Sequence, residues 1–357
     1  MRILIEARSL INRGGTATYC RELIRNLIKI DKTNEYFIIV PSEQKCEFWA
    51  PNFKIVPIKS RGYFNQIKGN LKIKSLITEK SIDLVHYTKG IGPRLKNIKL
   101  VSTVNDIIPL THPKFSLLLN RFYWQINLPQ NIKRSNKIIT ISKYCKDSLI
   151  KWFPDSRPKI RVIYDGAMCK IRRMNKENGD YILFLSRVQK RKNIKRILLA
   201  FENVSSKNKN LKMLIAGEVP YEGKFVYSLI NKNKSASKIK LLKHISENKK
   251  IQLLTNAKFL IFASLIEGFG LPILEAQACG CPVITSNLSS MPEVAGKGAL
   301  FVNPYSVDEI EGAMEKVMKD SKLKENLIKE GYKNIKKYSW KKCAKETLSI
   351  YNEAYNE

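Results

Sequence analysis

The stretch Glu267-Gly-Phe-Gly-Leu-Pro-Ile-Leu-Glu275 decides the fold, because it has the composition of a loop that opens a helix directly after a buried strand. The apolar run 257–263 that precedes it predicts the strand. Gly268 and Gly270 allow the backbone to approach a ligand closely, and Pro272 suits the first turn of a helix. The free N–H groups at such a helix start form an anion site that fits a diphosphate.

A carboxylate stands at each end of this stretch. Glu267 lies in the loop, where it could accept hydrogen bonds from sugar hydroxyls, and Glu275 lies in the first helical turn, where it could bind a ribose diol. A structural interpretation, in which Glu275 only complements the helix dipole and the glycines only make a turn, would explain a lone Gly-x-Gly but not the whole string.

The rest of the chain alternates strands with helices and restarts once, after the polar stretch 170–180. This pattern predicts two α/β domains with parallel sheets, whose ligands bind beyond the carboxyl ends of the strands. The expected strands are 2–6, 36–40, 54–58, 83–86, 99–104 and 137–141, then 181–185, 212–216, 238–242 and 257–263, with one more inside 280–286. The expected helices include 17–30, 193–204, 321–337 and a last amphipathic helix after Ser339.

The composition excludes several classes of protein. Of the 357 residues 44% are apolar, and the seven cysteines are scattered without CxxC spacing, which favours reduced thiols over zinc or disulfide frameworks. The N-terminus has the pattern of a buried strand and not of a signal peptide, so we expect a cytosolic location. No Asp-x-Asp occurs in the sequence, so nothing indicates a metal-bound nucleotide-sugar site.

The net charge of +33 is concentrated in residues 51–250, which hold 43 Lys and Arg against 12 Asp and Glu. Such a surface suits anionic lipid, nucleic acid or phosphorylated substrates. The alternative is that lysine serves as general surface filler. The sequence contains no zinc finger, RRM signature or basic motif interleaved with aromatics, so we expect no nucleic-acid partner.

The stretch from Glu267 to Glu275 resembles the Glu-x7-Glu signature of the family 4 glycosyltransferases, which adopt the two-domain GT-B fold. The resemblance extends from Arg2 to Tyr351. It includes the helix and strand of 276–285, the loop 287–294, the basic segment Arg187-Val-Gln-Lys-Arg-Lys-Asn193, and the acceptor-half segments Asp106-Ile-Ile-Pro-Leu110 and Ile139-Thr-Ile-Ser142.

The resemblance implies an α/β, GT-B fold with two facing Rossmann-like domains. The first, residues 1–168, would bind the acceptor and be completed by a C-terminal helix, 339–357, that crosses back to it. The second, residues 177–337, would bind the nucleotide-sugar donor.

Basic side chains follow the expected strand 181–185. Arg187 and Lys192 could neutralise a leaving diphosphate as the glycosidic bond breaks, and the resemblance assigns them that role. We expect Lys190 and Arg191 to be solvated. Ser186 stands where the family usually has glycine.

The resemblance also implies backbone sites for the donor. Gly14 and Gly15 would approach its phosphates from the first domain, although a simple tight turn is an equal alternative. Gly217, Ile245 and the backbone from Gly268 through Phe269 and Gly270 to Leu271 would line its site together with Glu275.

Asn105 and Asp106 stand where members of the family often have His-Asp. Asn105 can donate a hydrogen bond but cannot titrate. His86 or His112 could compensate, although a lone histidine is more often structural. The candidate catalytic residues are therefore Glu267, Arg187, Lys192, Asp106 and Asn105, with no metal ligand.

The function implied is a retaining, metal-independent glycosyltransferase that needs no cofactor besides its nucleotide-diphosphate sugar. The resemblance leans towards transfer of a hexose such as mannose onto a glycan in surface polysaccharide synthesis. The glycan would be lipid-linked, with undecaprenyl diphosphate as one candidate carrier. Basic charge beside Tyr63, Phe64, Phe115, Leu117 to Leu119 and Phe122 to Trp124 predicts peripheral binding to an anionic membrane, at its cytoplasmic face. The alternative is that these aromatics are core residues, above all Phe122 to Trp124.

Three alternatives belong to other classes. A sugar-nucleotide epimerase of the same architecture would turn over donor without acceptor, and the string from Glu267 to Glu275 argues against it. A nucleic-acid-binding protein is suggested by charge alone. A dinucleotide oxidoreductase would need a Gly-x-Gly-x-x-Gly after a strand, which the sequence lacks.

Overall fold

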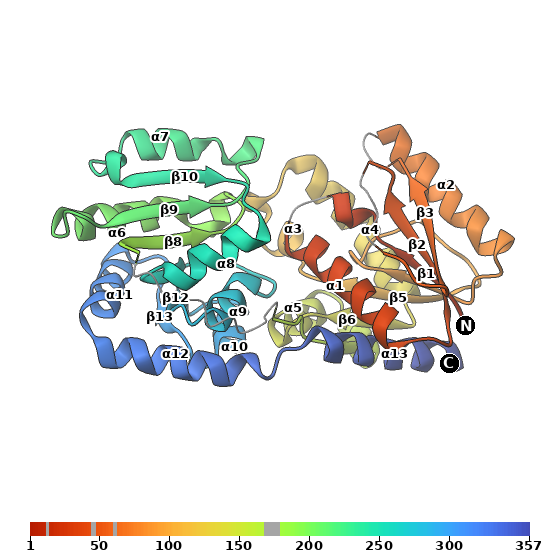
Figure 1. Cartoon of the computed structure of the whole chain (residues 1–357). Helices are drawn as coiled ribbons and strands as arrows, with labels where there is room; N and C mark the ends of the chain where they lie inside the picture. The colour runs from red at the N-terminus through yellow and green to blue at the C-terminus, as the bar shows by residue number, and fades with distance from the viewer. Residues whose placement is uncertain (12–13, 44–47, 60–62, 168–178) are drawn as a thin grey trace. The chain divides into compact units, whose positions relative to one another are not determined.

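The computed structural model describes residues 1–11, 14–43, 48–59, 63–167 and 179–357, and the chain folds into two compact units (Figure 1). Unit 1 comprises Met1–Gly166 together with Ser339–Glu357, and unit 2 comprises Ala167–Tyr338. Most of the predicted linker, as well as Cys46 and Cys169, lies outside the described residues.

Unit 1 is built on a parallel sheet whose described strands have the order β3-β2-β1-β4-β5-β6-β7. The first strand, β1, lies between β2 and β4, and its Ile3 lies opposite Tyr36 of β2 and Leu84 of β4. The strands are β1 (Arg2–Glu6), β2 (Glu35–Pro41), β3 (Phe53–Ile58), β4 (Leu84–Tyr87), β5 (Lys99–Val104), β6 (Lys137–Thr140) and β7 (Ile160–Val162). The α-helices are α1 (Gly15–Ile30), α2 (Tyr63–Glu79), α3 (Ile108–Thr111), α4 (Leu118–Arg134), α5 (Lys143–Trp152) and α13 (Trp340–Asn356).

Helix α13 completes unit 1 although it comes last in the sequence. It packs against α1, whose residues Tyr19, Leu23 and Leu27 are spaced four apart and are fully buried. The hydroxyl of Tyr351 lies 2.7 Å from Nδ1 of His86 in β4. The return of the C-terminal helix to the first unit, which the resemblance predicts, is therefore present.

Unit 2 repeats this architecture on a parallel sheet with the order β10-β9-β8-β11-β12-β13. The strands are β8 (Tyr181–Leu185), β9 (Lys212–Ala216), β10 (Ile239–Lys243), β11 (Phe259–Phe262), β12 (Val283–Ser286) and β13 (Leu300–Val302). The α-helices are α6 (Ile194–Ser206), α7 (Phe225–Asn231), α8 (Glu247–Asn256), α9 (Leu271–Ala278), α10 (Met291–Ala295), α11 (Val307–Lys319) and α12 (Ser321–Ile335).

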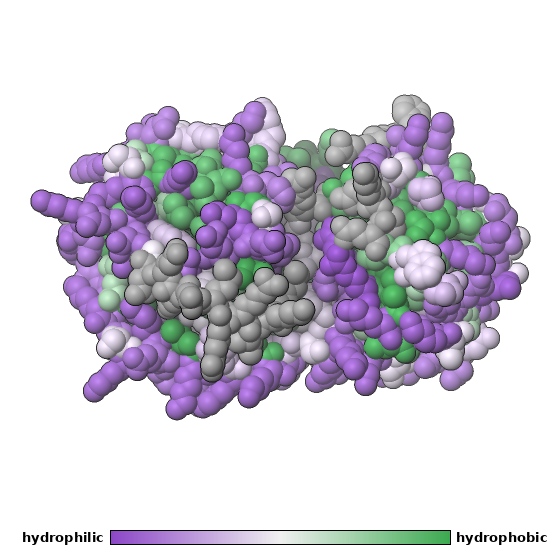
Figure 2. Space-filling model, in the orientation of Figure 1, coloured by the Kyte–Doolittle hydropathy of each residue, from purple (hydrophilic) through white to green (hydrophobic). Residues whose placement is uncertain are grey.

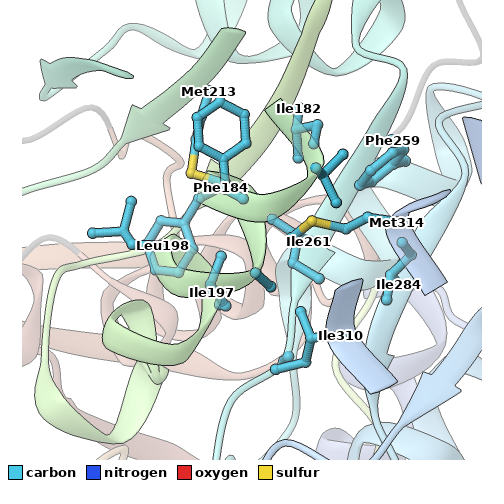
Figure 3. Packing of buried hydrophobic residues seen from close by; sticks show 14 of the residues in the cluster. Ile182, Phe184, Ile197, Leu198, Met213, Phe259, Ile261, Ile284, Ile310 and Met314 are labelled. Atoms are coloured by element: carbon cyan, nitrogen blue, oxygen red, sulfur yellow. The ribbon is translucent and has the colours of Figure 1, made fainter. Parts of the chain in front are cut away.

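The central strands of this sheet are buried on both faces, which explains why β8 and β11 read as continuous apolar runs. One face packs against α6 and α11, and Figure 3 shows this cluster around Phe184, Ile197 and Met314. The opposite face carries alternate residues of the same strands, such as Leu260, and packs against Ile273 of α9.

Several helices begin where a short polar side chain satisfies a free backbone N–H group. The side chains of Ser142, Ser246, Ser306, Asp320 and Ser339 each accept a hydrogen bond from the N–H group three residues further on. The last of these caps begins α13 at the Tyr338-Ser339 boundary that we predict. These local signals therefore mark where five helices, in both units, start.

Figure 2 shows hydrophilic side chains over most of the face in view. In the described part of the chain, no helix combines the length and the apolar character needed to span a membrane.

Candidate active site

The strand order of unit 2 reverses between β8 and β11. The chain moves from β8 to β9 and β10 on one side, and β11 then pairs with β8 on the other side. The segments that follow β8 and β11 therefore leave the same edge of the sheet next to each other. Ligands of open parallel sheets bind at such a switch point.

Glu267 is held there by two cations from the segment after β8. Arg191 Nη1 donates to Oε2 of Glu267 at 2.7 Å, and Lys192 Nζ donates to Oε1 at 2.5 Å. Burial raises the pKa of Glu267, but the charges of Arg191 and Lys192 outweigh it and lower the pKa to about 2. The carboxylate is thus buried, ionised and fixed in position.

The structure corrects one prediction in this segment. Lys190 is exposed, as expected, but Arg191 is not simply solvated. Its side chain is 20% exposed and forms an ion pair with Glu267, because the short 3-10 turn Lys190–Lys192 directs it towards the loop after β11. Asn193 follows with φ 60°, and its Nδ2 donates to the carbonyl of Ala263 at 3.1 Å.

The loop that carries Glu267 is fixed from the segment after β12. The hydroxyl of Ser290 donates to the carbonyls of Glu267 (3.0 Å) and Phe269 (2.7 Å), and the hydroxyl of Ser289 accepts from the N–H of Glu267 at 3.1 Å. Gly270 then begins α9 with φ 118°, a conformation that favours glycine. The predicted strand–loop–helix context of this stretch is confirmed.

Glu275 is the second buried carboxylate of the stretch, and it lies beyond the first turn of α9, not in that turn as predicted, because the helix begins at Leu271. Lys250 of α8 donates to its Oε1 at 2.6 Å and also pairs with Glu247 at 2.8 Å. Burial lowers the pKa of Lys250, but Glu275 and Glu247 outweigh this effect and raise it. Glu275 is therefore more than a helix-dipole partner, because a specific cation from another helix holds it.

The remaining candidates of unit 2 lie at the ends of β8, β9 and β10. Arg187 pairs with Glu218 (3.7 Å) and Glu222 (3.6 Å), and within the described part of the chain its ion pairs do not include Glu267. Gly217 has φ 144°, and a Cβ there would lie 2.0 Å from the carbonyl oxygen of Ser186. Its N–H donates to the carbonyl of Lys243 at 2.7 Å, which ties it to the strand end before Ile245.

The candidates of unit 1 follow β1 and β5. Gly14 and Gly15 are exposed at the start of α1. Asp106 accepts from the N–H of Ile108 at 3.0 Å. Asn105 donates from Nδ2 to the carbonyl of Thr88 at 3.1 Å, while its Oδ1 is buried without a hydrogen-bond partner among the described residues. A buried amide oxygen of this kind is suited to accept a hydrogen bond from a ligand.

His86 cannot take the place of the histidine that the family usually has next to Asp106. His86 is fully buried between Tyr351 and the hydroxyl of Thr103, 2.8 Å from Nε2, and burial lowers its pKa to about 3. His112 lies beside Phe115, and burial lowers its pKa as well, with a smaller effect of Lys114. His86 is thus part of the core of unit 1.

No three His, Cys, Asp or Glu side chains in the described ranges gather into a group that could hold a metal ion. The sequence did not single out Arg191, Lys250, Ser289 or Ser290 as site residues. Ser289 and Ser290 belong to the loop 287–294, whose resemblance to the family could have identified them as site residues. Lys250 lies on a separate helix, and its position in the sequence gives no sign of its contact with Glu275.

Comparisons with known proteins agree with this geometry. A family described as glycosyl transferases group 1 matches residues 170–334, and one described as glycosyltransferase family 4 matches residues 13–168. O-antigen chain mannosyltransferase B of Escherichia coli is 25% identical over 268 residues, which cover 71% of this chain and 70% of that protein. O-antigen chain mannosyltransferase RfbU of Salmonella typhimurium is 29% identical over 247 residues, covering 69% and 68%.

The structure is similar to that of sucrose-phosphate synthase from Thermosynechococcus elongatus, with a TM-score of 0.81 at 15% identity over 99% of each chain. The fold is therefore GT-B, with two parallel-sheet, Rossmann-like units. Since the family matches span both units and include the stretch from Glu267 to Glu275, the chain belongs to the group 1, or family 4, glycosyltransferases.

Proposed function

We propose that this glycosyltransferase moves a hexosyl group, with mannose as the first candidate, from a nucleotide-diphosphate sugar to a glycan of a surface polysaccharide. The choice of sugar and product is supported by relatives whose names specify mannosyl transfer to O-antigen chains. The observation that carries the proposal is the buried Glu267 at the switch point of unit 2, held by two cations beside the start of α9.

Each part of the donor has a suitable partner there. The N–H groups at the start of α9 and the ammonium group of Lys192 would bind the diphosphate. Arg187 would join them by leaving Glu218 and Glu222, whose ion pairs with it are long and partly exposed. Glu275 would accept hydrogen bonds from the ribose diol, and Glu267 from the hydroxyls of the transferred sugar.

The proposed reaction is metal-independent and retains the anomeric configuration. The bond between the anomeric carbon and the diphosphate oxygen breaks while the acceptor oxygen attacks from the same face. The acceptor proton passes to the leaving phosphate, so the step needs no protein base. The negative charge that develops on the diphosphate is stabilised by Lys192 and the dipole of α9. The anomeric configuration of the product, read by NMR, tests retention directly.

The acceptor side of the proposal assigns unit 1 to a lipid-linked glycan at the cytoplasmic face of an anionic membrane. Its support is the first half of α4, where large apolar side chains are exposed, among them Leu119 at 84%. Leu117, Leu118, Phe122, Tyr123 and Ile126 are exposed as well. Trp124, predicted in the same patch, is instead buried in the core of unit 1, and the side chains of Tyr63 and Phe64 lie outside the described ones.

This surface can be tested by sedimentation with liposomes of increasing anionic lipid content at low and high salt. Leu119→Asp should weaken binding, since it places a charge in the apolar patch and repels anionic lipid. Leu199→Asp, at an exposed leucine of α6 in unit 2, is the matched control. Equal loss in both variants, or no binding of the wild type to any vesicle, would reject the membrane assignment.

The donor assignment is tested by thermal denaturation with a panel of nucleoside diphosphates and nucleotide sugars, because a ligand that binds only the folded state raises the Tm. We expect one base to stand out, both as diphosphate and as its sugar conjugate. The double variant Arg187→Ala, Lys192→Ala should lose this shift, while Lys190→Ala should retain it. A panel in which no nucleotide raises the Tm would reject the proposed function.

A further inference from the structure

Arg191 connects the segment after β8 to the loop after β11 through three hydrogen bonds. Its backbone carbonyl accepts from the N–H of Leu265 at 2.8 Å. Its Nη1 donates both to the carbonyl of Ile266 at 3.1 Å and to Oε2 of Glu267 at 2.7 Å. The guanidinium group is therefore fixed on two sides, by a backbone oxygen and by a carboxylate.

Lys192 is held differently although it pairs with the same carboxylate. Its ammonium group binds the other oxygen of Glu267 and lies 5.0 Å from the centre of the Phe262 ring. A lysine ammonium is a point charge on a flexible stem, whereas the planar guanidinium of arginine keeps its geometry and its charge. Of the two cations, Lys192 is the one whose charge can move to a new partner.

The roles of the two cations follow from the proposed function, on which this inference rests. If Lys192 binds the diphosphate of the donor, it must give up at least part of its contact with Glu267. We propose that Arg191 is a positioning residue, which keeps Glu267 charged and in place while Lys192 turns from Glu267 to the diphosphate.

The physical reason is the cost of a buried carboxylate without a counter-ion. Glu267 is only 6% exposed, so losing its last cation would leave a buried charge, which is strongly unfavourable. Without Arg191, Lys192 would have to stay with Glu267, and the donor would lose a cation. With Arg191 in place, one oxygen of Glu267 keeps its partner and Lys192 is available. Arg191 would thus raise donor affinity without touching the donor.

The test measures the affinity of the full-length protein for GDP and UDP by titration calorimetry. Arg191→Met keeps the length of the side chain but removes its charge, and should weaken binding of the preferred diphosphate about 10- to 100-fold, the scale of losing one charge-assisted contact to the diphosphate. Glu267→Gln alone should not weaken binding, because it releases Lys192. Arg191→Met combined with Glu267→Gln should restore the affinity to within about threefold of Glu267→Gln.

The control is Lys190→Met, which removes the exposed neighbouring cation and should leave the affinity unchanged. Thermal denaturation of each variant shows whether it is folded. If Arg191→Met binds as tightly as the wild type, or if Glu267→Gln fails to restore binding in its background, Arg191 only joins the two loops and the inference is overturned. A wild type that binds neither GDP nor UDP nor any other nucleoside diphosphate of the thermal-denaturation panel overturns the proposed donor itself, which is a distinct outcome.

Discussion

Replacing Glu267 with glutamine should remove a pH-dependent part of the stability of unit 2. Burial raises the pKa of this carboxyl, but Arg191 and Lys192 lower it more, from 4.5 to about 2. Because the pKa is lower in the folded state, the ionised group stabilises the fold above pH 4.5, and this stabilisation is lost as the pH falls towards 2. A difference of about 2.5 at 1.36 kcal/mol for each pKa unit corresponds to about 3 kcal/mol.

The measurement is urea denaturation between pH 3 and pH 7, followed by far-UV circular dichroism. The free energy of unfolding of the wild type should rise between pH 3 and pH 6 by about 2 kcal/mol more than that of Glu267→Gln. Glu325→Gln, at an exposed carboxylate of α12 in the same unit, shows how much of this difference comes from net charge alone. A stability difference between wild type and Glu267→Gln that stays constant over this pH range would refute the reasoning.

Three further changes probe other parts of the site. Gly270→Ala should lower the free energy of unfolding by about 1–3 kcal/mol in urea denaturation, because φ is 118° there and the new Cβ would lie 3.1 Å from Cδ1 of Ile273; an unchanged stability would contradict this. Lys250→Met should reduce affinity for the donor in calorimetry, since Glu275 loses the cation that holds it, and an equal or higher affinity would show that Lys250 instead blocks Glu275. Glycosyl transfer should continue in excess EDTA, and an activity abolished by chelation and restored by Mg²⁺ or Mn²⁺ would exclude a metal-independent mechanism.

The sequence predicted most of the strands because the strands of parallel sheets are buried on both faces and appear as apolar runs. The runs 181–185 and 212–216 match β8 and β9 residue for residue. The strands β7 and β13 were not predicted. Both are only three residues long and lie at a sheet edge, so their apolar pattern is too short to stand out.

The site could be predicted to the level of loops but not of side-chain pairs. The composition from Glu267 to Glu275 indicated the loop and helix, because glycine and proline at those positions have local conformational causes. The pairing of Arg191 with Glu267 depends on the adjacency of β8 and β11 and on the direction in which a short turn points its side chains. The spacing of residues in the sequence reveals neither the strand adjacency nor the direction of the turn. The prediction that Arg191 is solvated is therefore wrong.

For the exposed half of α4, the sequence leaves two interpretations open and the structure decides between them. A run of leucines and aromatics predicts either a buried helix or an interfacial patch, and sequence alone does not separate the two. The structure divides the run, since Trp124 and Leu128 pack into the core of unit 1 while Leu117 to Leu119 face outward. The separation follows from the orientation of the helix, which tertiary packing sets.

The central claim is that the two buried carboxylates of unit 2 bind the donor of a glycosyl transfer. The most direct test is the rate of transfer from the preferred nucleotide sugar by Glu267→Ala and Glu275→Ala, with circular dichroism to show that both remain folded. Loss of a preorganised contact to the transition state predicts a decrease of about 10²–10³ in each variant. Transfer by both folded variants at close to the wild-type rate would contradict the claim.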